Sequence, residues 1–347
     1  MHRLWLHEKS RKCMCVKYKG DMKSVKWGII GAGAVCERKS GPAFYEIEHS
    51  WLRAIMRRDA EKAADFAKRH GVRRYYTDAD QLINDPEVNI VYIATPPHLH
   101  KEYAIRVLQA GKPVYVEKPM AMSYAECLEI VEAAKQANQK LFVAHYRRAL
   151  PYFLKVKDLI DSQAIGKILT VNVRLFRPAS ASDMDKQQQT WRLKREIAGE
   201  GYFFDLAPHT LDILDFLLGE IIDAKGYYSN LGGYYDVADT LSAILQFKSG
   251  AQGVAEWCFI SSEKTREDTI TITGTEGSIR FSTFQFTPIL LSSTDREQFF
   301  MPAQPDHIQQ PLIQTIVDEL RGSCTCPSTG ETALRTAKVM DMIIGKI

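Results

Sequence analysis

Short apolar runs alternate with helical patterns between Val25 and about Tyr146, and this alternation limits the possible folds more than any other feature of the chain. Two of the helical patterns end just before Gly71 and Gly111, and glycine is common immediately after a helix. Runs this apolar are typical of strands buried on both faces, which indicates a parallel sheet covered by helices. The N-terminal part is therefore predicted to be an α/β domain of the Rossmann type. The predicted strands are 25–30, 52–56, 89–95, 113–116 and 141–146, and the predicted helices are 61–70, 100–110 and 124–138.

The pattern changes after Pro151, where a predicted helix at 152–162 leads into a strand at 168–177. A polar stretch at 179–189 is interpreted as a mobile loop. The next helix is predicted to open at Pro208, because proline is well suited to a first helical turn.

Strand patterns dominate from 223 to about 301, and Lys248-Ser249-Gly250 between two apolar runs is a hairpin signal. The last helix is predicted to open with a capping box formed by Ser328 and Glu331. We therefore expect an α+β domain with a large, mainly antiparallel open sheet. The predicted division is an extension at 1–22, the Rossmann domain at 23–147 and the second domain at 148–347.

Composition limits the partners of this 347-residue chain. The net charge is +3, but residues 1–22 hold six basic and two acidic residues, so the remainder is close to neutral and gives no electrostatic footprint for nucleic acid. No stretch approaches the roughly 18 apolar residues that a membrane helix needs. The first 22 residues are interpreted as a disordered extension, with Met22 a plausible native start.

The seven cysteines accompany no export signal, so we expect thiols in a reducing, cytoplasmic compartment. Cys13-x-Cys15 and Cys324-x-Cys326 could together supply four thiolates to zinc, but the one-residue gaps depart from the usual spacing. No metal site is therefore expected.

The first predicted strand runs into Gly31-Ala32-Gly33, a turn that can hold a dinucleotide pyrophosphate against the following helix. Cys36 occupies the third position of the fingerprint, so the motif is imperfect. The second strand ends in Arg57 and Arg58, where an arginine suits the 2′-phosphate of NADP. NADP(H) is therefore favoured over NAD(H), and the alternative is that both arginines are solvated surface charges.

Two later strand ends should lie beside the same ligand, since open parallel sheets bind ligands beyond the carboxyl ends of their strands. These ends are Thr95-Pro96-Pro97 and Glu117-Lys118-Pro119. His98 and His100 are interpreted as polar residues at a helix entry rather than as catalytic groups. The predicted cofactor-binding residues are Gly31, Gly33, Ala34, Arg57, Arg58, Thr95, Pro96, His100, Glu117 and Lys118.

Asp205 and His209 lie close together in the second half and could carry proton-transfer chemistry. Transfer of a hydride from a carbinol carbon requires removal of the hydroxyl proton by a nearby base. A histidine in a first helical turn should be neutral, because the helix dipole disfavours its cation, and His209 is therefore the candidate base. Lys118 would stabilise the developing alkoxide, and Asp205 would orient His209 or bind a substrate hydroxyl. Singly, each residue is better explained as a cap or a packed polar group; together they favour a site.

The order of these motifs resembles the glucose–fructose oxidoreductase / inositol dehydrogenase / rhizopine-catabolism (Gfo/Idh/MocA) family, from Val25 to the C-terminus. The motifs that carry the resemblance are Gly31-Ala32-Gly33, Ala94-Thr95-Pro96, Glu117-Lys118-Pro119 and Asp205-x-x-x-His209-x-x-Asp212. The resemblance implies a catalytic set of Lys118, Asp205 and His209 and a cis peptide before Pro119. It also implies a homodimer or homotetramer formed through the open sheet. Pro97 and Glu200 depart from the family pattern.

The resemblance implies an NAD(P)-dependent oxidoreductase that acts on a sugar, inositol or related polyol. Two alternatives remain: a glycoside hydrolase that uses tightly bound NAD, and a sensor of the dinucleotide state without catalysis. Further candidate substrate residues could instead pack the domain junction. The candidate substrate residues are Tyr146, Arg147, Trp191, Arg192 and Asp205.

Overall fold

The computed structural model describes residues 22–294 and 296–347, so the predicted extension lies outside the described residues except for Met22. The backbone amide of Met22 donates a hydrogen bond to the carbonyl oxygen of Leu320 at 2.9 Å. No described helix is long and apolar enough to cross a bilayer.

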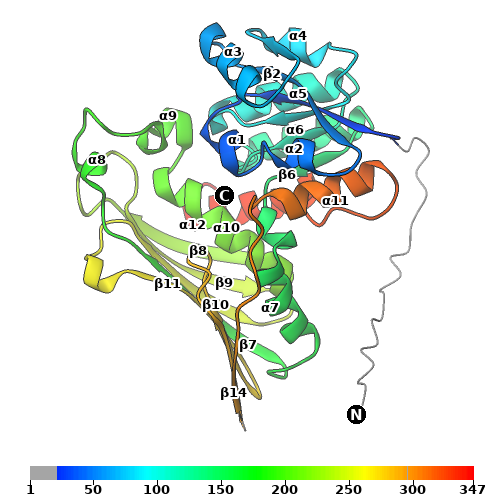
Figure 1. Cartoon of the computed structure of the whole chain (residues 1–347). Coiled ribbons are helices and arrows are strands. Elements are labelled where there is room, and N and C mark those ends of the chain that lie inside the picture. The colour runs from blue at the N-terminus through cyan, green and yellow to red at the C-terminus, as the bar shows by residue number, and fades with distance from the viewer. Residues whose placement is uncertain (1–21, 295) are drawn as a thin grey trace, which may run out of the picture.

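The first domain is built on a six-stranded parallel sheet in the order β3-β2-β1-β4-β5-β6, which is the Rossmann order (Figure 1). This confirms the predicted parallel sheet. Its strands are β1 (Val25–Ile30), β2 (Ser50–Met56), β3 (Arg74–Tyr76), β4 (Ile90–Ile93), β5 (Val114–Val116) and β6 (Leu141–Val143). Its helices are α1 (Ala34–Arg38), α2 (Ala43–Glu46), α3 (Ala60–Arg69), α4 (Ala79–Ile83), α5 (His100–Gln109) and α6 (Tyr124–Gln136).

The second domain is built on an eight-stranded sheet in the order β14-β13-β12-β11-β7-β10-β9-β8. Every pair is antiparallel except β7 with β10, so the predicted mainly antiparallel sheet is confirmed. The strands are β7 (Ile168–Phe176), β8 (Ile221–Ser229), β9 (Thr240–Phe247), β10 (Gln252–Cys258), β11 (Glu267–Gly274), β12 (Gly277–Phe281), β13 (Ile289–Ser293) and β14 (Arg296–Phe300). Buried and exposed residues alternate along β9 and β10, so one face is covered and the other is open.

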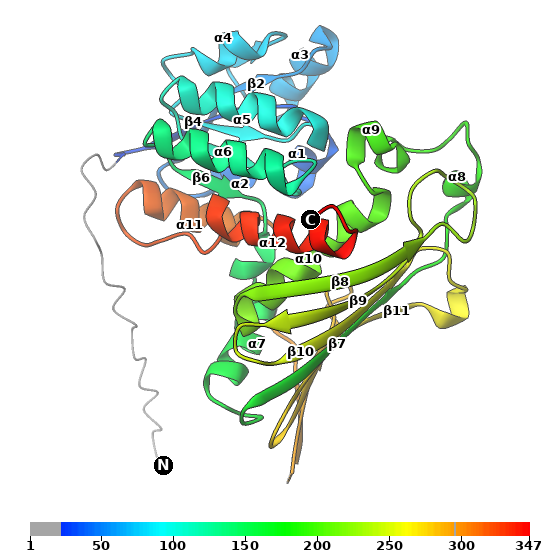
Figure 2. The ribbon, with the colours of Figure 1, turned by 180° about the vertical axis from the view of Figure 1, so that it is seen from behind.

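Helices lie between the two sheets, as Figures 1 and 2 show from opposite sides. They are α7 (Pro151–Asp161), α10 (Gly201–Leu218), α11 (Gln310–Leu320) and α12 (Gly330–Ile343). α10 packs on the second sheet, where the rings of Phe203 and Trp257 have centroids 5.2 Å apart. α12 ties the C-terminal segment to the first domain, because Asp341 accepts a hydrogen bond from the backbone amide of Tyr124 at 2.8 Å.

The prediction that a helix opens at Pro208 is wrong, because α10 begins seven residues earlier, at Gly201. Proline inside a helix removes one backbone hydrogen bond. α10 is nonetheless buried along most of its length, and the apolar contacts of its side chains offset that loss. Asp205 and His209 therefore both lie within the helix, and neither belongs to a first turn opened by Pro208.

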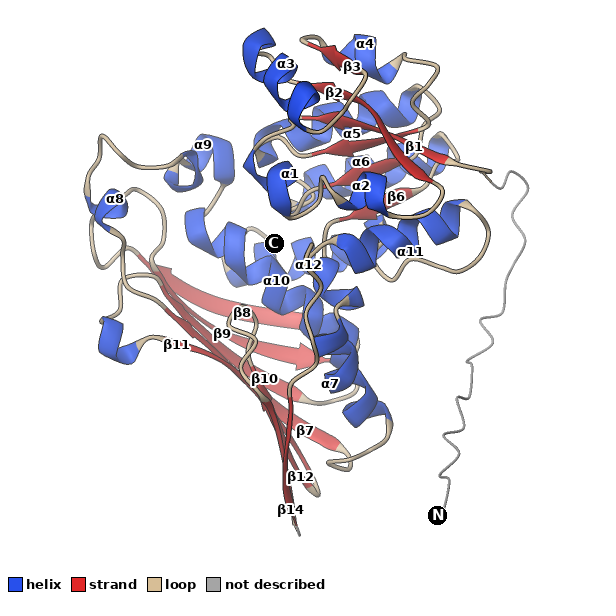
Figure 3. Cartoon of the chain, viewed as in Figure 1, coloured by secondary structure: helices blue, strands red, loops and turns tan. Residues whose placement is uncertain are grey.

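Two smaller predictions are also corrected. The stretch 179–189 is not entirely loop, since it contains α8 (Ala181–Met184), which a reciprocal capping box between Ser180 and Asp183 stabilises. The cap of α12 is Thr329 with Thr332, one residue beyond the predicted pair. The Ser328 hydroxyl instead donates to the carbonyl oxygen of Val143 at 2.7 Å. Short elements without a strong pattern were missed, including β3 at the exposed edge of the first sheet (Figure 3).

Candidate active site

The candidate site is a cavity of about 350 Å³ between the carboxyl ends of the first sheet and helix α10. A second cavity of about 410 Å³ extends over the glycine turn, and the two share lining residues, among them Thr95, Trp191 and Arg192. The residues before α10 contribute Trp191 and Arg192 from a 3₁₀ turn, and α9 (Arg195–Ala198) follows them. The shared walls make one continuous cleft with a cofactor end and a substrate end.

The glycine turn at the cofactor end fits a close approach of ligand to backbone. Gly31 has φ +87°, and a Cβ there would lie 2.8 Å from Cγ2 of Thr95. A Cβ on Gly33 would meet nothing closer than a carbonyl oxygen 3.7 Å away, so the space above this residue is open. Within the described part of the chain the buried hydroxyl of Thr95 has no hydrogen-bond partner. These features fit a dinucleotide whose pyrophosphate lies at the start of α1.

Cys36, at the imperfect third position of the fingerprint, is fully buried. Burial raises the pKa of its thiol to about 12, so the group is a neutral thiol. A neutral buried cysteine packs like a small apolar residue, which is what close contact between helix and strand requires here. The departure at this position is therefore compatible with dinucleotide binding.

Arg57, Arg58 and Asp59 line the second cavity together. Asp59 is the N-cap of α3, as predicted: its carboxylate accepts from the backbone amide of Lys62 at 3.0 Å and pairs with the Lys62 amino group at 3.0 Å. The structure gives the side chains of Arg57 and Arg58 no hydrogen bond or ion pair with other described residues. The acidic group at this strand end is thus occupied, whereas the two guanidinium groups are available to a ligand.

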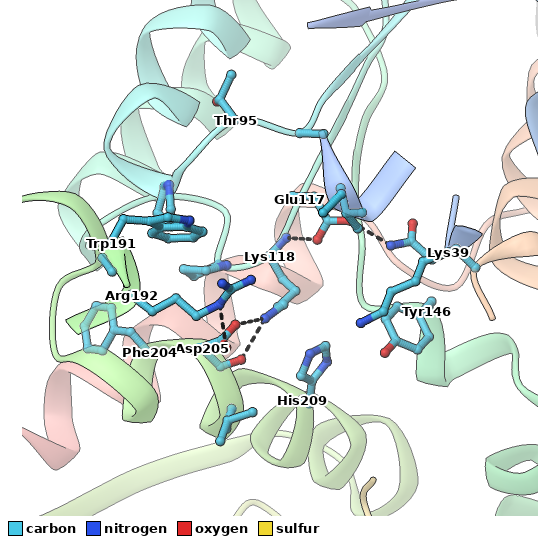
Figure 4. Close-up of a pocket in the computed structure, with 18 of the residues that line it drawn as sticks. Lys39, Thr95, Glu117, Lys118, Tyr146, Trp191, Arg192, Phe204, Asp205 and His209 are labelled. Atoms are coloured by element: carbon cyan, nitrogen blue, oxygen red, sulfur yellow. Dashed lines mark hydrogen bonds and ion pairs between the residues drawn. The ribbon is translucent and has the colours of Figure 1, made fainter. Parts of the chain in front are cut away.

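Lys118 lies at the centre of the substrate end, where its amino group contacts Asp205 Oδ1 at 2.6 Å and the Asp205 carbonyl oxygen at 2.7 Å (Figure 4). The other carboxylate oxygen of Asp205 lies 3.2 Å from Nε of Arg192. Burial raises the pKa of Asp205, but Lys118 and Arg192 more than offset this and hold it below its usual value. Asp205 is therefore ionised and shared by two cations. The peptide bond between Lys118 and Pro119 is cis, as expected.

Glu117 orients the strand end that carries Lys118. Its carboxylate accepts from the Tyr92 hydroxyl at 2.5 Å and from the Gln309 amide at 2.7 Å. Glu117 is nearly fully buried, so both bonds are shielded from water. The residue lines the substrate cavity, but its oxygens are used in holding the loop.

His209 projects into the same cavity from the middle of α10, and its partner is Arg147 rather than Asp205. A guanidinium nitrogen of Arg147 lies 2.6 Å from His209 Nδ1. The guanidinium also lies between the rings of Tyr146 and Phe284, 4.9 and 4.6 Å from their centroids. Burial and the charge of Arg147 lower the pKa of His209 well below its usual value, so the ring is neutral. The expected neutrality holds, but burial and a neighbouring cation cause it, and not a helix dipole.

The contact with Arg147 also selects the tautomer of His209. Arginine has only donors, so Nδ1 must accept and cannot carry the ring proton. A neutral imidazole then has its N–H at Nε2, and this nitrogen is the one left to face a substrate. His209 is thus arranged as a hydrogen-bond donor.

Comparison with known proteins agrees with this geometry. Residues 25–145 match the model for the "Oxidoreductase family, NAD-binding Rossmann fold", and residues 153–280 match the "GFO/IDH/MocA C-terminal domain". The chain belongs to the Gfo/Idh/MocA oxidoreductase family. It is an NAD(P)-dependent oxidoreductase.

Several relatives of this Gfo/Idh/MocA protein carry names that describe a reaction. "Oxidoreductase P35" of Formosa agariphila is 40% identical over 92% of this chain and 98% of its own length. "Levoglucosan dehydrogenase" of Pseudarthrobacter phenanthrenivorans is 32% identical over 75% of this chain and 74% of its own. The solved structure of a levoglucosan dehydrogenase in complex with NADH and levoglucosan has a TM-score of 0.80 and 26% identity, and covers 93% of this chain and 96% of that one.

Most of the predicted site residues of this family member come together in the cleft. Lys118, Asp205, His209, Tyr146, Trp191 and Arg192 line the substrate end, and Gly31, Gly33, Ala34, Arg57, Arg58, Thr95 and Pro96 line the cofactor end. Arg147 lies behind His209 rather than on the cavity wall.

His100 was predicted to contact the cofactor, but it lines neither cavity. Its two ring nitrogens lie 2.9 and 2.8 Å from the carbonyl oxygens of Pro119 and Thr95, so it supports both strand ends from behind. Of the two departures from the family pattern, Pro97 lines the substrate cavity, whereas Glu200 is buried in an ion pair with Arg195.

Sequence reasoning missed several residues that line the substrate cavity. Among them are Lys39, Phe204, Phe284 and Gln309. Two of them lie close in the sequence to a predicted motif, and this closeness could have indicated them. Lys39 comes just after the helix that follows the glycine turn, and Phe204 is the neighbour of Asp205. Gln309 lies 192 residues from Glu117 and follows no recognisable pattern. Among the described residues no group of three or more His, Cys, Asp or Glu side chains that could hold a metal ion occurs.

Proposed function

We propose that the protein transfers a hydride between NADP(H) and a carbinol or carbonyl carbon of a sugar, inositol or related polyol. The observation that carries the proposal is the Lys118 amino group, held 2.6 Å from Asp205 in the cavity that continues into the glycine-turn cleft. The name of one relative, levoglucosan dehydrogenase, supports a sugar-like substrate, since levoglucosan is a small cyclic sugar derivative.

The nicotinamide, when bound, supplies or accepts the hydride. Lys118 is proposed to transfer the proton at the reacting oxygen: its ammonium donates to a carbonyl oxygen in reduction, and its neutral amine accepts the hydroxyl proton in oxidation. Asp205 holds the Lys118 amino group in the substrate cavity and compensates its charge.

This assignment exchanges the roles predicted from the sequence for Lys118 and His209. His209 is engaged at Nδ1 by Arg147, so it is poorly placed to accept a proton and well placed to donate a hydrogen bond through Nε2. Such a donor would stabilise negative charge on the substrate oxygen as the carbonyl is attacked.

NADP(H) is proposed over NAD(H), because the side chains of Arg57 and Arg58 line the second cavity with no hydrogen-bond or ion-pair partner in the part of the chain that the structure describes, while Asp59 pairs with Lys62. A guanidinium fork suits the 2′-phosphate that distinguishes the two cofactors. A dissociation constant for NAD equal to or lower than that for NADP would contradict this preference.

We also propose assembly into a homodimer or homotetramer through the open face of the second sheet. Ile244 and Val254 pair across β9 and β10 on that face and are 62% and 46% exposed. An apolar face of this kind is typical of a subunit interface. We further propose that the boundary between the two domains lies between residues 147 and 148. A cytoplasmic location is also proposed.

The test uses purified protein stripped of cofactor. NADPH and NADH are titrated by fluorescence, and polyols, sugars and ketoses are then screened by absorbance at 340 nm. Tight NADPH binding with turnover of a sugar-like compound is the expected result. Binding without turnover would favour a dinucleotide sensor, and a cofactor that cannot be removed would favour the hydrolase.

A further inference from the structure

We propose that the substrate is an anionic sugar, with a carboxylate as the preferred anionic group, and that Lys39 binds this group. The inference rests on the proposed function, because it concerns the substrate end of the same cleft. It narrows the substrate class from polyols in general to polyols that carry one negative charge.

Lys39 follows α1 directly and lines the substrate cavity. Figure 4 shows its amino end directed into the cavity beside Tyr146. Its backbone is fixed on both sides: its backbone amide donates to the Val35 carbonyl oxygen at 3.1 Å, and its carbonyl oxygen accepts from the backbone amide of Gln309 at 3.1 Å. The flexible side chain of Lys39 therefore extends from a fixed backbone position.

The charges that line the cavity do not balance within the protein. Three cations face it, Lys39, Lys118 and Arg192, against the carboxylates of Glu117 and Asp205. Asp205 is already shared by Lys118 and Arg192, and Glu117 is occupied by Tyr92 and Gln309. In the part of the chain that the structure describes, no carboxylate pairs with the amino group of Lys39.

A second cation, Arg147, stands directly behind His209 without a carboxylate partner among the described residues. Its other contacts are a carbonyl oxygen of Thr283 at 2.9 Å and two aromatic rings. The substrate end is therefore electropositive beyond what its own acids neutralise. A cleft with an excess of positive charge raises the local concentration of anions and favours an anionic ligand.

The cofactor is a poorer explanation of Lys39 than the substrate. The pyrophosphate belongs at the start of α1, near Gly33, whereas Lys39 lies past the opposite end of that helix. Lys39 lines only the substrate cavity, whereas Ala34 and Val35 line both. Lys39 also contributes to the pKa values of Asp205 and His209, although burial is the largest influence on each. Its charge therefore acts where the substrate would lie.

The experiment compares matched acidic and neutral compounds with NADP⁺ and the full chain. The pairs are D-glucuronate with D-glucose, D-galacturonate with D-galactose and D-gluconate with D-glucitol. D-glucose 6-phosphate and D-glucose 6-sulfate test whether another anionic group replaces the carboxylate. Values of kcat/KM are measured at low and high NaCl, and binding to the protein–NADP⁺ complex is measured by calorimetry.

At least one acid is expected to exceed its neutral partner by ~10-fold or more, the order of a hydrogen bond between charged groups, and added salt should reduce the preference. Lys39→Met should raise KM for that acid by ~10-fold and raise KM for the neutral partner by much less, because only the acid loses a charged contact. Lys39→Arg should restore most of the loss. Arg38→Met is the matched control, because it removes a neighbouring charge that lines neither cavity.

Three outcomes would overturn the inference: no acid preferred in turnover or in binding, Lys39→Met affecting both members of a pair equally, or Arg38→Met matching Lys39→Met. Turnover of neutral sugars without an acid preference would leave the proposed function intact. Tight binding of an acid that depends on Lys39, with no turnover of any compound, would support the anion site and contradict the proposed hydride transfer between NADP(H) and these sugars. If the phosphate or sulfate ester is preferred over the uronate, the carboxylate is not the preferred anionic group, and the ester group takes its place in the proposal.

Discussion

Helix α10 carries two charged clusters that use the same residue types and face different surroundings. Near its middle, Asp205 and His209 meet Lys118, Arg192 and Arg147 at a cavity wall. Toward its end, Asp212 and Asp215 are held by Arg148 and Arg335.

The adjacent residues Arg147 and Arg148 divide between the two clusters. The side chains of Arg148, Asp212 and Asp215 are at most 4% exposed, and Arg148 contacts both carboxylates at 2.8–2.9 Å. The first cluster instead leaves Lys118 and His209 open to a ligand. Residue type alone does not separate a catalytic cluster from a structural one; what each cluster faces does.

The largest effect on activity is expected at the cluster that faces the cavity, which contains Lys118, Asp205 and His209. Lys118→Met should lower kcat by ~10³-fold, since general acid–base groups typically contribute 10²–10⁴-fold. The dissociation constant for NADPH and the midpoint of thermal unfolding should stay close to those of the parent protein. Steady-state rates at 340 nm and a fluorescence titration measure the two quantities, and normal turnover would remove Lys118 from the catalytic set.

The buried cluster of Arg148, Asp212 and Asp215 should respond in the opposite way, with a loss of stability and little loss of activity. Arg148→Met leaves Asp212 and Asp215 buried with less compensation, and loss of one partner of a buried ion pair costs about 3–5 kcal/mol. Denaturant unfolding should show this loss, while kcat per folded molecule changes little. A variant that unfolds like the parent but has lost its activity would place Arg148 in the functional cluster.

His209 allows the donor and base roles to be separated. His209→Ala should lower kcat by ~10²-fold, whereas His209→Gln, whose side-chain amide can still donate, should lose only ~10-fold. Equal losses in the two variants would indicate that His209 accepts a proton instead. The comparison is made at matched cofactor saturation.

The pH dependence of stability follows from the same residue. The pKa of His209 is lowered in the folded protein by burial and Arg147. Below about pH 6.5 the His209 imidazole is therefore protonated in the unfolded chain and stays neutral in the folded protein. Unfolding free energy should therefore fall as pH decreases from 6.5. His209→Gln should reduce this slope by up to ~1.4 kcal/mol per pH unit. An unchanged slope would contradict a neutral, buried His209.

The smallest expected effect lies at the cofactor end, where the side chains of Arg57 and Arg58 have no hydrogen-bond or ion-pair partner among the described residues. Arg57→Ala and Arg58→Ala together should weaken NADPH binding by ~10-fold or more, the order of a lost charge-assisted hydrogen bond, and leave NADH binding nearly unchanged. Titration of both cofactors measures this difference. An equal loss of affinity for NADPH and NADH would mean that the two arginines do not bind the 2′-phosphate.

The sequence allowed the sheet of the first domain to be predicted because its strands are apolar on both faces and its turns are marked by glycine. β3 escaped because its three residues lie at an exposed edge and carry little apolar signal. The start of α10 was misplaced because the local preference of Pro208 was overridden by burial along the whole helix. Tertiary packing of this kind is not encoded in a short window.

The catalytic candidates were found because each falls at a strand end or within one short motif. The partner of His209 was not found, because Arg147 reaches it from 62 residues away and approaches from behind the cavity. Lys39 was overlooked for a related reason: an exposed lysine after a helix is ordinary until the cavity beside it is known.

The most direct test of hydride transfer uses NADPH deuterated at C4 of the nicotinamide, in separate (4R) and (4S) forms, with a ketose or keto-acid that the protein reduces. Mass spectrometry of the product locates the label. We predict that one of the two forms places deuterium on the carbon that becomes the carbinol. A reduced product without deuterium from either form would contradict direct transfer between the nicotinamide and the substrate.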